Sequence, residues 1–230
     1  SIAGIKAFDW EEQFHEKFDI VIGNPPYVRV QLIPHKEIDW YKENKKTAFQ
    51  RIDVSLFFFE LAKHVLKPKG MVGFISTNAF QVAKYGKNMR KFLLEEFRIL
   101  KLIDFNSLQV FENASTYVGI FLLENEKPRN FSYLSVKQDN FEQGNFAPMD
   151  DFHEINIKDL TDDSWVLGDL DSLNLMMKIS SHKKIGEIGN AGTGVITGND
   201  KILLLDERRL KEIGIEKEMV LPVITGKDPE

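Results

Sequence analysis

The stretch that decides the fold is Phe18-Asp19-Ile20-Val21-Ile22-Gly23-Asn24-Pro25-Pro26-Tyr27. Its apolar run, bounded by Asp19 and Gly23, is typical of a short buried strand. Proline fixes φ and has no N–H, so the residues from Asn24 onward cannot continue a sheet ladder. The stretch therefore predicts a strand over 18–23 and a rigid loop at its carboxyl end, where open α/β sheets place their ligands.

This loop carries a distinctive set of groups. Asn24 offers an amide and Pro25 a free carbonyl, which are hydrogen-bond acceptors, and Tyr27 offers an aromatic face. Together they suit the binding of an exocyclic amino group on a flat ring. The alternative for so short a motif is an ordinary strand followed by a proline turn.

The loop resembles motif IV of the S-adenosylmethionine-dependent amino-methyltransferases. Its Asn-Pro-Pro-Tyr version is typical of DNA adenine-N6 methyltransferases. The same version also occurs in enzymes that methylate glutamine side chains or guanine amino groups. The motif therefore indicates the chemistry, methylation of a planar nitrogen, better than it indicates the substrate.

The composition narrows the classes of protein. The chain has 230 residues, of which 43% are hydrophobic and 28% charged, as in ordinary globular proteins. Cysteine is absent, which excludes disulfides and thiolate metal sites, and we expect no metal. No apolar run approaches the ~18 residues of a membrane helix. The net charge of −5 is not the footprint of a stand-alone DNA-binding protein.

Hydrophobic periodicity predicts the elements that follow the loop. Residues 28–50 are interpreted as a mobile excursion over the site with short helical content. Asp53 is the predicted N-cap of a helix over 54–66, which Lys67-Pro68-Lys69-Gly70 ends. Further strands are predicted over 71–76, 99–104, 117–123 and 131–136, with helices near 89–97 and 173–180. Strands that alternate with helices favour a mainly parallel sheet.

Changes in residue composition along the chain suggest three parts. Residues 1–125 carry the strand–helix pattern. Residues 126–165, with Pro128, Gly144 and Pro148, are interpreted as a linker or connecting subdomain. Residues 166–230 contain a glycine-rich stretch from Lys184 that predicts tight turns between short strands.

Residues 18–123 together resemble the carboxyl half of a gamma-class DNA adenine-N6 methyltransferase, with motifs IV to VIII in order. The variety that it resembles is TaqI-like, as in Type IIG restriction-modification polypeptides, and "FHEKFDIVIGNPPYVR" (14–29) is especially similar to it. The resemblance implies an α/β fold: the carboxyl half of a Rossmann-like methyltransferase sheet in 1–125. It also implies the start of a DNA target-recognition domain in 166–230, and a prokaryotic cytoplasmic enzyme that methylates specific sites in duplex DNA.

The resemblance also assigns site residues. Asn24 and Pro25 match the pair that accepts hydrogen bonds from the target amino group. Tyr27 and Phe111 match the two aromatics that stack on a flipped base. Residues matching the cofactor's surroundings are Pro26, Asp53 and Phe58. An N-cap role for Asp53, and core roles for Phe58 and Phe111, remain the structural alternatives.

One part of the family pattern has no counterpart. The glycine-rich motif I loop, which binds the methionine part of S-adenosylmethionine, is expected upstream, because Gly4 alone is no such loop. The chain also lacks an initiator Met, so we interpret it as a segment whose partners are duplex DNA and the upstream part of the same polypeptide. Whether that part includes a nuclease domain stays open. The isolated segment should bind the cofactor weakly or not at all.

Three alternatives remain at this point. A protein-glutamine or an RNA-guanine methyltransferase would use the same loop chemistry, and a non-catalytic DNA-binding module could retain the fold.

The resemblance to only the carboxyl half of the methyltransferase sheet also has a consequence for the first strand. The strand over 18–23 would lie at the edge of the partial sheet, so we expect another segment or chain to cover it.

Overall fold

The computed structural model describes residues 13–28, 30–112, 117–168, 175–176, 178–179, 181–189 and 203–221. The chain divides into two compact units, 1–179 and 180–230. The elements of the first unit are β1 (Phe18–Gly23), η1 (Val30–Leu32), α2 (His35–Asn44), α3 (Val54–Val65), β2 (Leu66–Thr77), η2 (Ala79–Gln81), η3 (Lys84–Gly86), α4 (Lys87–Glu96), β3 (Arg98–Asp104), β4 (Val118–Glu124), β5 (Phe131–Ser135), α5 (Gln138–Glu142), η4 (Met149–Asp151), β6 (His153–Ile155) and η5 (Ile157–Asp159).

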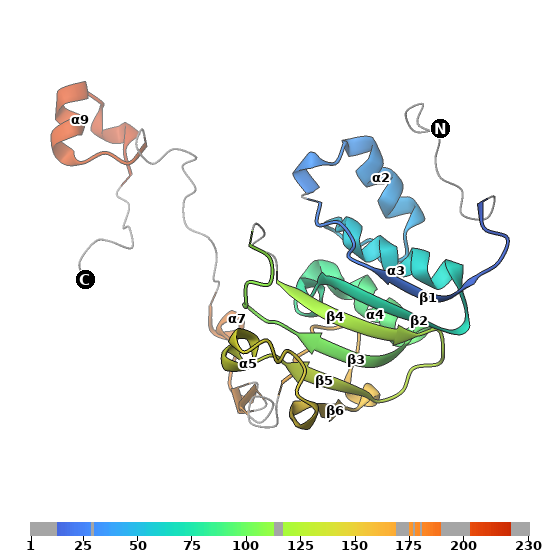
Figure 1. Ribbon diagram of the computed structural model, residues 1–230. Coiled ribbons are helices and arrows are strands. Elements are labelled where there is room, and N and C mark those ends of the chain that lie inside the picture. The colour runs from blue at the N-terminus through green and yellow to red at the C-terminus, as the bar shows by residue number, and fades with distance from the viewer. Residues whose placement is uncertain are drawn as a thin grey trace. The chain divides into compact units, whose positions relative to one another are not determined.

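The first unit is built on one six-stranded sheet with the order β1-β2-β4-β3-β5-β6 (Figure 1). β1 pairs with β2, and β3 with β5, in parallel. β4 runs antiparallel between β2 and β3, and β6 runs antiparallel to β5 at the far edge. The α/β class is confirmed, but the predicted mainly parallel sheet is wrong, because three of the five strand pairings are antiparallel.

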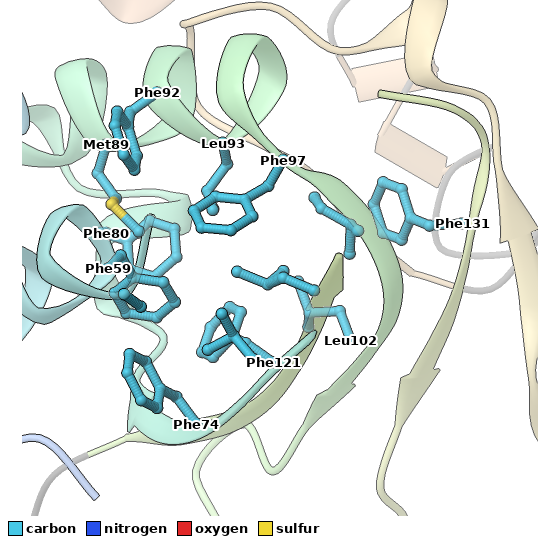
Figure 2. Close-up of a cluster of buried hydrophobic side chains, with 14 of the residues drawn as sticks. Phe59, Phe74, Phe80, Met89, Phe92, Leu93, Phe97, Leu102, Phe121 and Phe131 are labelled. Carbon is cyan, nitrogen blue, oxygen red and sulfur yellow. The ribbon is translucent and has the colours of Figure 1, made fainter. Parts of the chain in front are cut away.

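The main core lies where α3 and α4 cover one face of the sheet (Figures 1 and 2). Phe59 of α3 meets Phe74 of β2 and Phe121 of β4 edge-to-face, with ring centroids 5.1 Å and 5.6 Å away. From α4, Phe92 and Leu93 join the same cluster. Aromatic side chains of this size dominate core energetics, so this layer holds both helices to the sheet.

Helix α3 begins as predicted. The Asp53 side chain accepts a hydrogen bond from the Ser55 N–H at 3.1 Å and so satisfies one of the free donors of the first turn. The helix ends one residue earlier than predicted, at Val65, and the chain passes directly into β2. Lys69, within β2, has a left-handed φ of 63°, in the stretch where the pairing of β1 with β2 is irregular.

Residues 126–165 take part in the sheet and its core. β5 and β6 are strands of the sheet, and Tyr133, Ile155 and Trp165 lie in the main core cluster. The Trp165 backbone N–H donates to the Gln81 carbonyl at 2.8 Å. Arg90 of α4 donates through Nε to the Asp162 carbonyl at 3.0 Å. This segment, interpreted from sequence as a linker, therefore extends the first unit, whereas the functional division of the chain into three parts remains a prediction.

The second unit contains α7 (Ile185–Ile188), α9 (Glu207–Ile213) and η6 (Lys217–Met219). Asp206 caps α9 by accepting from the Arg209 N–H at 2.8 Å, and Gly214, at φ 74°, ends it. Residues 185–188 form a short helix where tight turns between strands were predicted. The remaining glycine-rich residues, 190–202, lie outside the described residues, as do half of the positions of the helix predicted over 173–180. The described positions of that helix, 175–176 and 178–179, are helical.

Candidate active site

The Asn24–Tyr27 loop follows β1, as predicted, at the carboxyl end of that strand. Pro25 is buried, whereas Asn24 and Pro26 are exposed and Tyr27 is half-buried. The Tyr27 hydroxyl donates to the Ile75 carbonyl of β2 at 3.3 Å. The Val28 N–H donates to the Pro26 carbonyl at 3.2 Å and tightens the end of the loop. The loop is therefore fixed to the neighbouring strand through its aromatic residue.

A cavity of about 360 Å³ lies beside β1 and α3. Asn24 and Pro25 line it together with Phe58 of α3, and the rest of its wall is mostly apolar. Ligand pockets typically have this character: apolar walls with a few polar groups that orient the ligand. Of the residues predicted to contact the cofactor, Phe58 lines this cavity, whereas Pro26 and Asp53 do not.

Tyr27 and Phe111 form a second group. Their ring centroids are 6.1 Å apart and the rings are tilted by 49°. Both are half-buried and pack against a smaller core cluster on the opposite face of the sheet from α3 and α4. The structure thus brings together the two aromatic residues predicted to stack on a base, although 84 positions separate them in the sequence. Here each ring contacts the other.

Asp53 links helix α3 to this region. Its Oδ1 accepts from the Ser55 hydroxyl at 2.6 Å as well as from the Ser55 N–H. The Tyr85 hydroxyl donates to its Oδ2 at 3.4 Å. Burial, and secondarily the negative charge of Asp53, raises the pKa of Tyr27 to about 12. Tyr27 therefore keeps its proton at neutral pH and remains a hydrogen-bond donor.

Sequence reasoning missed two polar residues near this site. Tyr85 lies in η3, and burial together with Asp53 raises the pKa of its hydroxyl to about 12. Asp104 ends β3 and is buried, and burial raises the pKa of its carboxyl. Neither belongs to a motif that was recognised. For Asp104, the one available signal was an acidic residue at the carboxyl end of an apolar strand.

Two classes of feature were not found in the part of the chain that the structure describes. No group of three or more His, Asp or Glu side chains there is placed to hold a metal ion. None of the described helices has the length and apolar character that crossing a membrane requires.

Comparisons with known proteins place the chain near restriction-modification methyltransferases. Residues 1–111 match the family described as Eco57I restriction-modification methylase. Among curated proteins, the chain is 32% identical over 228 residues to the Type II restriction enzyme and methyltransferase RM.Eco57I of Escherichia coli. It is 30% identical over 228 residues to the Type II methyltransferase M.XhoI of Xanthomonas vasicola. Residues 1–111 are thus similar to Eco57I-type restriction-modification methylases, and these two relatives carry the names of Type II methyltransferases or of a restriction enzyme and methyltransferase.

The matches cover most of this chain but only part of each relative. They include 90% of the chain and 22% of RM.Eco57I, and 92% of the chain and 41% of M.XhoI. The chain therefore spans less than half the length of these relatives. A solved structure, the type IIG restriction endonuclease BpuSI, has a TM-score of 0.47 and 16% identity over 61% of this chain and 19% of that chain.

Proposed function

We propose that this chain is part of a site-specific DNA adenine-N6 methyltransferase of a restriction-modification system, located in a prokaryotic cytoplasm. The observation that carries the proposal is the placement of the Asn24–Tyr27 loop. Its two acceptor residues, Asn24 and Pro25, line a cavity with Phe58. The ring centroid of Tyr27 lies 6.1 Å from that of Phe111. Restriction-modification names of the relatives support DNA as the substrate over protein glutamine or RNA guanine.

The chemistry that we propose for Asn24 and Pro25 follows from the nature of the substrate. An aromatic amine is a poor nucleophile because its lone pair is delocalised into the ring. The Asn24 side-chain oxygen and the Pro25 carbonyl accept hydrogen bonds from the two amine hydrogens and favour a pyramidal nitrogen, whose lone pair is localised. Asn24 and Pro25 thus act by positioning and electrostatic stabilisation, which needs no base with a shifted pKa.

Tyr27 and Phe111 are proposed to hold the target base outside the duplex. A base that leaves the stack loses stacking energy, and aromatic faces in the pocket compensate for part of that loss. The Tyr27 hydroxyl bond to Ile75 fixes one ring to the sheet, so the base stacks on a prepositioned surface. Site specificity is assigned to the remainder of the protein, including residues 166–230.

S-adenosylmethionine would supply an electrophilic methyl group. The apolar cavity with Phe58 on its wall fits a flat, weakly polar ring such as the adenine of this cofactor. Phe58 would contact that ring, while Pro26 and Asp53, which do not line the cavity, are proposed to contribute from its surroundings. The glycine-rich loop for the methionine part is proposed to lie in an upstream segment of the same polypeptide, which is therefore a partner of this chain.

The identity of the methylated product tests the proposal. The complete polypeptide is incubated with methyl-labelled S-adenosylmethionine and, in parallel, duplex DNA, total RNA or protein. The nucleic acids are then digested to nucleosides and separated. We expect the label in N6-methyladenine from duplex DNA. Label in another nucleoside, in RNA or in protein would overturn the proposal, as would a failure to label any of the three.

A further inference from the structure

A buried carboxylate lies between the segment that leaves β2 and the turn that leaves β3. Asp104, the last residue of β3, is 7% exposed. Its Oδ1 accepts from the Asn106 backbone N–H at 2.7 Å and from the Asn78 side-chain amide. Its Oδ2 accepts from the Gln81 side-chain amide at 3.3 Å and from the Tyr133 hydroxyl at 3.4 Å. Every neighbour of this carboxylate among these contacts is a donor.

Burying a carboxylate is unfavourable unless donors replace its hydration. Burial raises the pKa of Asp104, whereas the backbone and side-chain donors around it act in the opposite direction. The replacement of such a network by apolar residues is often neutral or stabilising. Stability alone is therefore a weak reason for this arrangement, and its position relative to the site becomes informative.

Three of the four donors to Asp104 come from two different loops, and the fourth, Tyr133, lies in β5. Asn78 and Gln81 lie in the segment that leaves β2, and the Ile75 carbonyl that accepts from Tyr27 is three positions before Asn78. Asn106 lies in the turn that leaves β3 and leads to Phe111. The carboxylate thus joins the segment that anchors Tyr27 to the segment that carries Phe111.

Hydrogen bonds continue from this turn to Phe111. Asn106 has a left-handed φ of 51°, and its side-chain amide donates to the Ser135 hydroxyl at 2.7 Å. Further along, the Gln109 side-chain amide donates to the Phe111 carbonyl at 3.3 Å and to the Glu112 carbonyl at 3.1 Å. Between them, the Leu108 N–H donates to the Phe105 carbonyl at 2.9 Å, so a series of local hydrogen bonds runs from the residue after Asp104 to the backbone at Phe111.

We propose that Asp104 is a positioning residue that sets the place of Phe111 relative to Tyr27 and thereby supports stacking of the flipped base. This inference rests on the proposed function. Asp104 contacts neither ring and acts through the Asn106 turn and the segment after β2. Its removal should therefore weaken productive DNA binding and leave the cofactor cavity beside Phe58 unaffected.

Four variants of the complete polypeptide separate this role from a general structural one. Asp104→Ala removes all four acceptor contacts. Asp104→Asn retains one oxygen for Asn78 and Asn106, and its new NH₂ group can donate to Tyr133 and to a flipped Gln81 amide. Tyr133→Phe removes a donor on the core side without touching either loop, and Phe111→Ala removes the stacking face itself.

We expect Asp104→Ala to raise the KM for duplex DNA about tenfold, as Phe111→Ala does, because a stacking face is lost or misplaced. The fluorescence of a 2-aminopurine at the target adenine should change in the same direction in both variants. Asp104→Asn should restore both values, and Tyr133→Phe should leave them unchanged. The Kd for S-adenosylmethionine should stay within about twofold in all variants, since Asp104 does not line the cavity.

The outcomes separate the two proposals. If the unmutated protein transfers no methyl group to DNA, the proposed function fails and this inference fails with it. If Phe111→Ala raises the KM for DNA and Asp104→Ala does not, this inference alone is overturned. Should Asp104→Ala not fold, Gln109→Ala, at an exposed position, breaks only the last link to Phe111. A raised KM for DNA in that variant supports the inference, and an unchanged KM overturns it.

Discussion

Polar residues at the ends of strands determine the geometry of the candidate site. Asn24 follows β1, and Asp104 ends β3 beneath the turn that leads to Phe111. The loop residues could be predicted from the sequence, because prolines and an aromatic residue after an apolar run form a local pattern. Tyr85 and Asp104 could not, because their partners are distant in the sequence and only the folded sheet brings them together.

The pH dependence of stability should reveal the buried state of Asp104. Its pKa in the folded chain is raised above the ordinary value of 3.8, so folding favours the protonated carboxyl. The contribution of this group to the free energy of unfolding is therefore fully present below 3.8 and is lost as pH rises through the raised value. The Asn side chain in Asp104→Asn does not titrate. Denaturant titrations should show the stability of the unmutated chain, relative to Asp104→Asn, falling as pH rises through this window.

A constant difference in the free energy of unfolding between the unmutated chain and Asp104→Asn across that pH range would mean that burial does not control the titration of Asp104. If the unmutated chain instead becomes more stable than Asp104→Asn as pH rises, the donors around the carboxylate outweigh its loss of hydration.

At the scale of elements, local periodicity predicted most strands and helices. The strands predicted over 18–23, 99–104 and 117–123 correspond to β1, β3 and β4 within one residue at each end. The position of β4 between β2 and β3 was not predictable in the same way. Pairing partners depend on contacts between segments far apart in the sequence, and an apolar run fits either orientation.

Strand β1 lies at the edge of the sheet, as predicted, but it is not the buried strand that its apolar run indicated, because none of its residues is buried. It is the first strand of the sheet, with β2 as its one partner among the described residues, and its Ile22 side chain is 81% exposed. Edge strands with exposed apolar side chains are templates for pairing with another chain. Which segment covers β1 stays a prediction.

An Ile22→Lys change should reduce self-association of this chain. A charged side chain on an edge strand opposes strand pairing, and the exposed position means that folding loses little packing. Sedimentation velocity at several protein concentrations measures the association, and thermal unfolding measures stability. Leu32→Lys is the matched control, because Leu32 is also exposed, at 75%, but lies in η1. An equal reduction in both variants would indicate a general effect of charge.

On the scale of the whole molecule, the extent of the first unit was the main surprise. Proline, glycine and acidic residues made 126–165 resemble a linker, yet Trp165 is 2% exposed in the main core. Composition reports the average polarity of a segment, whereas a few large apolar side chains, here Phe131, Tyr133, Ile155 and Trp165, place the segment in the core. The net charge of −5 likewise says little about where DNA would bind.

Replacement of Trp165 by Ala should destabilise the first unit by about 3–5 kcal/mol, the usual cost of removing a large buried aromatic side chain. The free energy of unfolding from urea titration measures this loss. Val166→Ala is the matched control, since the neighbouring side chain is 43% exposed and should change stability little. Equal and small effects of the two changes would show that residues 161–165 contribute nothing to the core.

The most direct test of the account is the rate of methyl transfer in a single turnover by the complete polypeptide carrying Asn24→Ala. Asn24 is exposed, so the change should not disturb folding. Asn44→Ala is the matched control, because that amide donates only to the Trp40 carbonyl of its own helix among its hydrogen bonds in the described structure. We expect Asn24→Ala to slow transfer to adenine by ~10²–10³ while Asn44→Ala leaves it unchanged. A rate within about threefold of the unmutated enzyme, far short of the loss expected for one preorganised group, would contradict the account and leave the Asn24–Tyr27 loop as only a turn.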